Sequence, residues 1–279
     1  MRIQAQLIPE PSGFNSALRL QYNTSLEISR TSWMSPPDLA AKLAAVTERI
    51  RLAAEKCHRS PEEISLLAVS KAHGSEAVRA LYQLGVTRFG ENYLQEAQDK
   101  QVRLADLPIE WHFIGPLQSN KTQAVARNFA WIHSLDRLKI ARRLSAQRPE
   151  SMPLLNCLIQ VNIDGEDSKS GINPDRVDDF AAELAGIERL QLRGLMAIPR
   201  PRLDYADQLA CHQYLARLGA KLRVKHPYCD QLSMGMSADL EAAIAAGSTI
   251  VRVGTDLLDR KSTRLNSSHS QQSRMPSSA

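Results

Sequence analysis

Hydrophobic residues in the middle of the chain recur with two different spacings. After Pro36 and Pro37, apolar residues recur every three or four positions from Leu39 to Cys57, which predicts an amphipathic helix. The two prolines suit the first turn of such a helix. The next apolar run, Ile64–Val69, is short and continuous, as is typical of a strand buried on both faces. The pattern therefore predicts a helix followed by a buried strand.

This alternation continues along most of the chain. Eight short apolar runs predict strands: Ile64–Val69, Thr87–Gly90, Ile109–Gly115, Trp131–Leu135, Asn156–Ile163, Gln191–Ile198, Asp230–Met234 and Thr249–Gly254. Segments with helical spacing lie between them: 75–84, 92–104, 119–128, 136–147, 174–186, 204–225 and 238–246. Strands that alternate with helices pair in parallel through right-handed crossovers. Eight such strands, with no G-x-G-x-x-G after the first, favour an α/β fold with a single (β/α)8 TIM-type barrel over a doubly wound sheet.

The pattern departs from a complete barrel at its two ends. After the last predicted strand a helix is expected, but either that helix is missing or Asp256–Arg260 is its stub. Residues 260–279 hold seven serines and few large apolar residues, a composition too poor in apolar surface to fold. Residues 1–33 have no sustained period. We therefore predict a barrel over residues 34–259, a non-native or disordered extension before it, and a disordered or artefactual tail after it.

Charge and cysteine usage narrow the class of protein. The formal net charge of +5 comes from the two ends, because residues 34–259 hold 28 basic and 28 acidic residues. A neutral body does not support nucleic-acid binding. The four cysteines form no C-x-x-C pair, and no apolar run approaches the ~20 residues of a membrane span. We expect a cytoplasmic protein without a metal site, a nucleic-acid partner or a membrane partner.

In a barrel of this kind, chemistry is located where the strands end at their carboxyl side. Lys71 follows the first predicted strand almost directly. Apolar walls around its stem would disfavour the ammonium form, and a neutral amine is what Schiff-base formation with an aldehyde requires. The alternative interpretation is that Lys71 extends to solvent as the strand ends.

The loops after the last two predicted strands have the residues of an anion site. Ser233, Gly235 and Ser237 end the seventh strand, while Gly254 and Thr255 end the eighth. Tight turns with backbone N–H groups and hydroxyls bind phosphate in these two loops of many barrels. Ordinary helix capping by Ser237 is the alternative.

Three further polar residues lie at or within predicted strands. Arg252 shares a strand face with Gly254, so its guanidinium should face an anion or a ring, or else an acidic side chain of the body. Asn92 follows the second strand and either lines the site or caps the next helix. His112 lies in the middle of the third strand, where a hydrogen-bonded core histidine is the commoner role.

Eight segments of the chain resemble one known family: AVSK (68–71), RFGENYLQEAQDK (88–100), WHFIGPLQSNK (111–121), SLDRLKIARRL (134–144), IQVNIDGEDSKSG (159–171), LRGLMAIP (192–199), LSMGMSADLEAAIAAGST (232–249) and VRVGT (251–255). In this order, over residues 38–255, they resemble the YggS/PROSC family of pyridoxal phosphate homeostasis proteins. The resemblance implies an alanine racemase-like barrel without the second β-domain of that enzyme. It also implies binding of pyridoxal 5'-phosphate (PLP).

The resemblance implies a role for each matched site residue. Lys71 looks like the Schiff-base lysine, and Arg252 matches the arginine that faces the pyridine nitrogen. The remaining matched residues lie near the ring (Asn92), form the phosphate cradle (Ser237, Gly254, Thr255) or support its turn (Ser233, Gly235). After the last turn, relatives carry a Phe-Gly pair where this chain continues with Asp256–Arg260.

Three classes of function follow from these residues. The resemblance implies a PLP-binding protein of vitamin B6 homeostasis without established catalysis, acting as a monomer, with PLP-dependent apoenzymes as candidate partners. A PLP-dependent amino-acid racemase is the alternative, but it needs a second acid/base group on the opposite face of the cofactor. The third class is a module that binds nucleic acid or protein, in which PLP is incidental.

Overall fold

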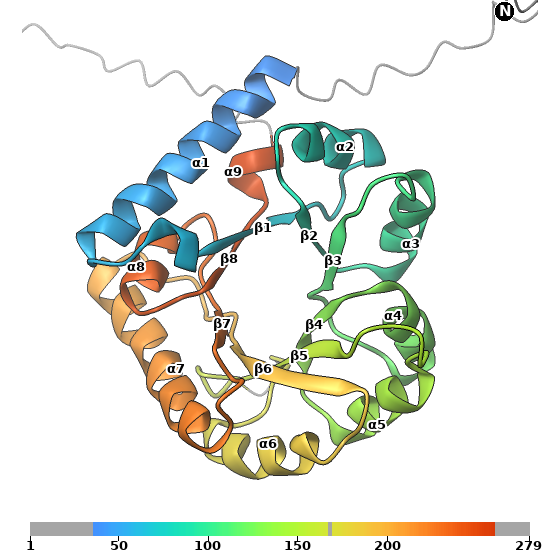
Figure 1. Cartoon of the computed structure of the whole chain (residues 1–279). Helices are drawn as coiled ribbons and strands as arrows, with labels where there is room; N and C mark the ends of the chain where they lie inside the picture. The colour runs from blue at the N-terminus through green and yellow to red at the C-terminus, as the bar shows by residue number, and fades with distance from the viewer. Residues whose placement is uncertain (1–35, 167–168, 260–279) are drawn as a thin grey trace, which may run out of the picture. The chain divides into compact units, whose positions relative to one another are not determined.

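Eight parallel strands close into one barrel in the computed structural model, which describes residues 36–166 and 169–259 (Figure 1). Each strand pairs with the next along the chain, and β1 also pairs with β8. The strands are β1 Ser65–Val69, β2 Arg88–Glu91, β3 Glu110–Phe113, β4 Trp131–Leu135, β5 Leu155–Gln160, β6 Leu190–Met196, β7 Gln231–Ser233 and β8 Ile250–Val253. The predicted (β/α)8 barrel is confirmed, and all eight predicted strands are present.

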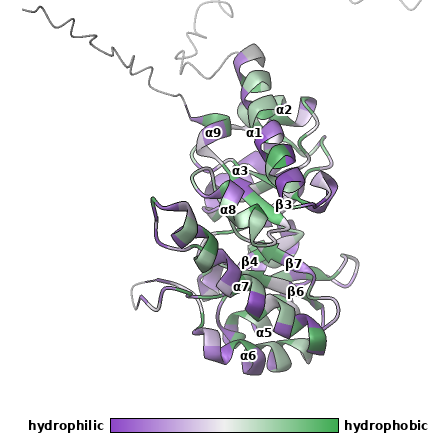
Figure 2. Ribbon diagram, turned by 90° about the vertical axis from the view of Figure 1, so that its left-hand side faces the viewer, coloured by the Kyte–Doolittle hydropathy of each residue, from purple (hydrophilic) through white to green (hydrophobic). Residues whose placement is uncertain are grey.

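A helix follows each strand and covers the outside of the barrel (Figure 1). The helices are α1 Pro36–Lys56, α2 Ser75–Gln83, α3 Leu94–Arg103, α4 Thr122–Asn128, α5 Leu138–Gln147, α6 Val177–Ala185, α7 Tyr205–Lys225, α8 Leu240–Ala245 and α9 Thr255–Leu258. Short 3-10 turns precede β1, α4 and α6 at Pro61–Glu63, Ser119–Lys121 and Pro174–Arg176. The helix ribbons alternate hydrophilic and hydrophobic residues (Figure 2), as one buried and one solvated face require.

The last helix of the barrel is a stub of four residues, α9. Its place outside β8 and β1 is filled by the long helix α1, which packs against α8 and α9 (Figure 1). Leu39, Val46 and Ile50 of α1 are buried in the main core. Among the described residues, the helix that precedes the first strand therefore covers the barrel wall beside the short helix α9.

The barrel interior is divided by polar residues. One small apolar cluster contains Leu67, Val69, Ile114 and Ile250, and another contains Trp131, Leu158 and Met196. Between them lie buried polar side chains on inward-facing positions: His112, His133, Gln160, Ser233 and Arg252. The large apolar cluster lies instead between the strands and the helices. A barrel interior with this much polarity needs complete hydrogen bonding to be stable.

The predictions for residues 1–33 and 260–279 lie outside the described residues. None of the helices in residues 36–166 and 169–259 has the length and apolar character that crossing a bilayer requires.

Candidate functional site

A cavity of about 380 Å³ lies at the carboxyl ends of the strands. Its walls come from the ends of β1, β2, β3, β6, β7 and β8 and from the loops that follow them. Six of the eight predicted site residues line it: Lys71, Asn92, Ser237, Arg252, Gly254 and Thr255. The other two, Ser233 and Gly235, lie behind this wall. The structure thus brings together residues that lie far apart in the sequence, from Lys71 to Thr255.

Lys71 is held through its backbone rather than through its side chain. The carbonyl of Ser70, on one side, accepts a hydrogen bond of 2.7 Å from Lys100 Nζ. On the other side, Ala72 has a φ of 63° and donates its N–H to Glu96 Oε2 at 2.9 Å. Within the described residues, Lys71 Nζ makes no hydrogen bond or ion pair. The residue is exposed, so the enclosure by apolar walls expected from the sequence is not what the structure has.

A buried ion pair supports this end of β1. Lys100 Nζ lies 2.6 Å from Glu91 Oε1, and Ser70 Oγ donates to the same oxygen at 2.5 Å. Burial raises the pKa of Glu91, although Lys100 and Ser70 both oppose the rise. Sequence reasoning did not single out Glu91, Glu96 or Lys100. The available signal was an acidic residue next to a buried strand, nine positions before a lysine on the following helix.

Asn92 presents an unpaired oxygen at this site. Its Oδ1 is buried and has no hydrogen-bond partner. The helix-capping alternative for Asn92 is wrong, because α3 begins at Leu94 and no side chain caps it. The backbone of Asn92 is approached closely by Gly115, where a Cβ would lie 2.1 Å from the Asn92 carbonyl oxygen. Gly115 therefore fixes the loop that carries Asn92.

Arg252 is almost fully buried, with 4% of its surface exposed. Its Nη1 donates to the carbonyl and the hydroxyl of Ser233 at 2.6 and 2.7 Å, and its Nη2 donates to the Ala197 carbonyl at 2.8 Å. No carboxylate in the described residues lies within ion-pair distance, so the predicted salt-bridge alternative is wrong. Burial lowers the pKa of Arg252 to about 10. The three bonds use three of its five N–H donors, which leaves two for an acceptor in the cavity.

The loops after β7 and β8 meet beside Arg252. Ser237 Oγ accepts a long hydrogen bond of 3.4 Å from the N–H of Asp256. Helix α8 begins only at Leu240, so the alternative interpretation, in which Ser237 is an ordinary helix N-cap, is wrong. Gly235 has a φ of 92°, and a Cβ there would lie 2.5 Å from the Cβ of Ala243. Gly235 therefore allows the turn that presents Ser237 to the cavity.

One charged side chain from outside the barrel, Arg49, fixes these loops. Arg49 of α1 donates to Glu241 at 2.7 and 2.9 Å, to Asp256 at 2.5 Å and to the Ser237 carbonyl at 2.9 Å. One guanidinium thus ties α1 to both loops at once. Sequence reasoning missed Arg49, because nothing in the local pattern connects it to residues near the end of the chain.

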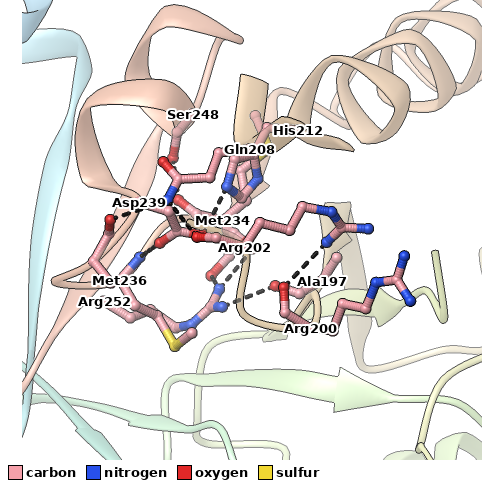
Figure 3. A network of polar contacts seen from close by, with 12 residues as sticks. Ala197, Arg200, Arg202, Gln208, His212, Met234, Met236, Asp239, Ser248 and Arg252 are labelled. Atoms are coloured by element: carbon pink, nitrogen blue, oxygen red, sulfur yellow. Dashed lines mark hydrogen bonds and ion pairs between the residues drawn. The ribbon is translucent and has the colours of Figure 1, made fainter. Parts of the chain in front are cut away.

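A second polar network holds the loop after β7 from the side of α7 (Figure 3). Asp239 accepts from the Met236 N–H at 2.7 Å and lies 2.9 Å from His212 Nε2. Burial favours a higher pKa for Asp239, but the bonds from His212 and Met236 outweigh it and the net pKa is lowered. Figure 3 shows Arg252 reaching the backbone of Ala197 within the same group of residues.

Comparison with known proteins accounts for this arrangement. The family model "Alanine racemase, N-terminal domain" matches residues 41–259. The Escherichia coli (strain K12) pyridoxal phosphate homeostasis protein is 52% identical over 221 residues, covering 78% of this chain and 94% of the relative. That of Pseudomonas aeruginosa is also 52% identical, over 219 residues. The chain belongs to the family of pyridoxal phosphate homeostasis proteins.

Solved structures agree with this membership. PipY of Synechococcus elongatus has been solved without PLP (TM-score 0.71, 36% identity) and with PLP bound (TM-score 0.69, 34% identity). Each match covers 78% of this chain and 99% of PipY. Alanine racemase from Corynebacterium glutamicum, at 16% identity and a TM-score of 0.57, shares the fold alone, and the match covers 61% of that enzyme. The predicted family is therefore confirmed.

Proposed function

We propose that this chain binds pyridoxal 5'-phosphate through Lys71 and takes part in intracellular PLP homeostasis without catalysis of its own. The observation that carries the proposal is that one cavity at the strand ends is lined by Lys71, Asn92, Ser237, Arg252, Gly254 and Thr255 together. Relatives at 52% identity bear the name pyridoxal phosphate homeostasis protein, and PipY binds PLP.

The polar groups around the cavity fit this cofactor. Lys71 Nζ has no partner in the described residues, which suits an amine that condenses with an aldehyde and releases water. Arg252 keeps two N–H donors for a ring nitrogen, which is an acceptor. The loops that carry Ser237, Gly254 and Thr255 supply hydroxyls and backbone N–H groups for a phosphate. Asn92, whose buried Oδ1 is unpaired, would lie beside the ring.

Arg252 argues for a cofactor that is held more than it is used. Even with its pKa lowered to about 10 by burial, the guanidinium remains protonated near neutral pH. It would donate a hydrogen bond to the pyridine nitrogen without transferring a proton to it. An unprotonated ring is a weaker electron sink, and PLP supplies its chemistry by drawing electrons into that ring.

A racemase would need a second acid/base group over the other face of the cofactor. Besides Lys71 and Arg252, the titratable side chains that line the cavity are His73 and Asp259. These two contact each other at 3.2 Å. We place the protein among PLP carriers, and we further propose that it is a cytoplasmic monomer with PLP-dependent apoenzymes as recipients.

The test is an absorbance spectrum of the purified protein, followed by borohydride reduction and peptide mapping by mass spectrometry. We expect a visible imine band and a pyridoxyl adduct on Lys71. The band should disappear in Lys71→Ala and persist in Lys139→Ala, which removes an exposed lysine of α5. A folded protein that takes up no PLP, or an adduct on another lysine, would refute the proposed site. Rapid exchange of the α-proton of D- or L-alanine would instead establish the racemase alternative.

A further inference from the structure

A continuous chain of hydrogen-bonded polar side chains crosses the barrel interior, and all of them are buried except the first, Glu110, whose side chain is 40% exposed. It begins at Glu110, the first residue of β3, whose Oε1 lies 2.9 Å from His112 Nε2. His112 Nδ1 lies 2.9 Å from His133 Nε2, and His133 Nδ1 lies 3.0 Å from Ser233 Oγ. Ser233 Oγ accepts from Arg252 at 2.7 Å. The chain therefore connects the amino-terminal end of the barrel to the guanidinium in the candidate cofactor cavity.

The two ends of this chain determine the direction of every hydrogen bond within it. A guanidinium only donates, and an ionised carboxylate only accepts. Ser233 Oγ accepts from Arg252, so its own proton is free to go to His133 Nδ1. His133 then carries its proton on Nε2 and donates to His112 Nδ1, and His112 donates from Nε2 to Glu110. One arrangement satisfies all of these atoms, with both histidines neutral.

The surroundings of the histidines agree with that arrangement. His112 is 1% exposed, and His133 and Ser233 are fully buried. Burial lowers the pKa of His112 and places that of His133 well below its ordinary value. The hydrogen bond from His112 lowers the pKa of Glu110. His112 also stacks on Trp131 with ring centroids 5.3 Å apart and planes 4° from parallel, which fixes its ring.

We propose that Glu110, His112, His133 and Ser233 act as positioning residues for Arg252. Because the Ser233 hydroxyl donates its hydrogen bond to His133, its lone pairs face Arg252. Nη1 is then fully occupied by Ser233, and the donors left for the cavity are those on Nε and Nη2. This row of hydrogen bonds begins at the opposite end of the barrel. It determines which N–H groups of Arg252 would meet the cofactor ring. This inference rests on the proposed function only in assigning a ring nitrogen to Arg252.

The first test needs no cofactor. Long-range ¹⁵N–¹H spectra of protein labelled with ¹⁵N-histidine report the tautomer and charge of each ring, and His133→Asn and His112→Asn assign the two signals. We expect both residues as neutral Nε2–H tautomers at pH 7. A charged ring, or an Nδ1–H tautomer at His133, would overturn the proposal. This outcome is independent of whether the protein binds PLP.

The second test measures the effect on the site. Ser233→Ala removes the link between Arg252 and His133. We expect PLP binding to weaken about tenfold, which is the effect of losing one charge-assisted hydrogen bond, and the absorption band to shift. Ser134→Ala is the matched control, because Ser134 is a buried serine of β4 whose hydroxyl donates to the Gly115 carbonyl, outside the chain. It should change affinity less than about twofold.

A double-mutant cycle tests whether His112 and Ser233 act on Arg252 through one hydrogen-bonded chain. The alternative is that each substitution disturbs the barrel core independently. His112→Asn changes a residue that is separated from Arg252 by both Ser233 and His133, so on its own it tests the connection even if Ser233→Ala folds poorly. In a connected chain the combined effect of His112→Asn and Ser233→Ala on PLP affinity stays near that of the larger single change. Additive effects, or equal losses in Ser233→Ala and Ser134→Ala, would reject the positioning role. If the unmodified protein binds no PLP, the proposed function fails. The histidine tautomers then still show whether the hydrogen bonds from Glu110 to Ser233 have the proposed directions.

Discussion

Replacing Arg49 tests how the two loops of the candidate phosphate site are held together. Arg49→Ala removes four hydrogen bonds from α1: two to Glu241, one to Asp256 and one to the Ser237 carbonyl. The loops after β7 and β8 lose the group that joins them. We expect a less stable protein and weaker PLP binding, because both loops must then be ordered by the cofactor itself.

The size of the effect follows from the exposure of these groups. One third of the Arg49 side chain is exposed, as are 44% of Glu241 and 27% of Asp256. Ion pairs of this exposure contribute about 0.2–1 kcal/mol each. With the bond to Ser237, the loss in free energy of unfolding should be about 1–2 kcal/mol. PLP binding should weaken about fivefold, because ordering the two loosened loops on binding costs about 1 kcal/mol of free energy.

The contribution of this cluster has a defined pH dependence. The hydrogen bond from Arg49 lowers the pKa of Glu241 below its ordinary value of 4.5. A carboxylate with a lowered folded-state pKa stabilises the protein above its unfolded pKa, and this stabilisation is lost as the pH falls through the folded pKa. The difference in stability between Arg49→Ala and the unmodified protein should therefore be full at pH 7 and shrink below pH 4.5.

Urea unfolding at several pH values and PLP titration measure these effects. Arg51→Ala is the matched control on the same helix, because Arg51 pairs with Glu48 and Glu55 within α1. It should leave PLP binding unchanged. Equal affinity losses in the two variants, or an undiminished cost of Arg49→Ala in acid, would refute the reasoning.

Three further variants probe the supports of the site, each measured by urea unfolding. Lys100→Met leaves Glu91 buried without its partner and should cost about 3–5 kcal/mol, much of it recovered by adding Glu91→Gln; equal losses in the single and double variants would contradict this. Ala72→Gly should raise stability by up to about 1 kcal/mol, because Ala72 has a φ of 63°; a loss would contradict it. His133 stays neutral when folded, so below pH 6.5 the unfolded state binds more protons and stability falls by up to ~1.4 kcal/mol per pH unit. His133→Asn should show a shallower fall between pH 6.5 and 5.5, and an unchanged slope would contradict the assignment.

The strands were predictable because the buried strands are short, apolar and separated by helical spacing. Trp131–Leu135 agrees with the sequence residue for residue. Elsewhere the ends differ by up to three residues, because ladder partners decide where a strand stops. The predicted strand Asn156–Ile163 ends at Gln160, since the next residue, Val161, pairs only through an isolated bridge to Ile172. Apolar character alone does not contain that information.

The candidate site was predictable to the extent that its residues follow buried strands. Lys71 and Thr255 lie directly beyond β1 and β8, and parallel strands bring such ends to one mouth. Ser233 was expected to support the phosphate turn, but its hydroxyl lies inside the barrel and binds Arg252. Arg49 was not predictable, because its partner Glu241 is 192 residues away in the chain. Contacts of this range depend on closure of the barrel.

The two basic side chains of the cavity, Lys71 and Arg252, are held in opposite ways, and the difference matters for the PLP-carrier role proposed above. Arg252 is buried and its guanidinium is fixed by Ser233 and Ala197. Lys71 is fixed only through its neighbours Ser70 and Ala72, so its side chain is free to approach or leave an aldehyde. If Lys71 holds PLP as proposed, release would require hydrolysis of the bond at Lys71, and rebinding in one orientation would require a hydrogen-bond donor already in place. A fixed Arg252 and a movable Lys71 would meet both requirements, because Arg252 is held inside the barrel whereas Lys71 lies at its exposed end.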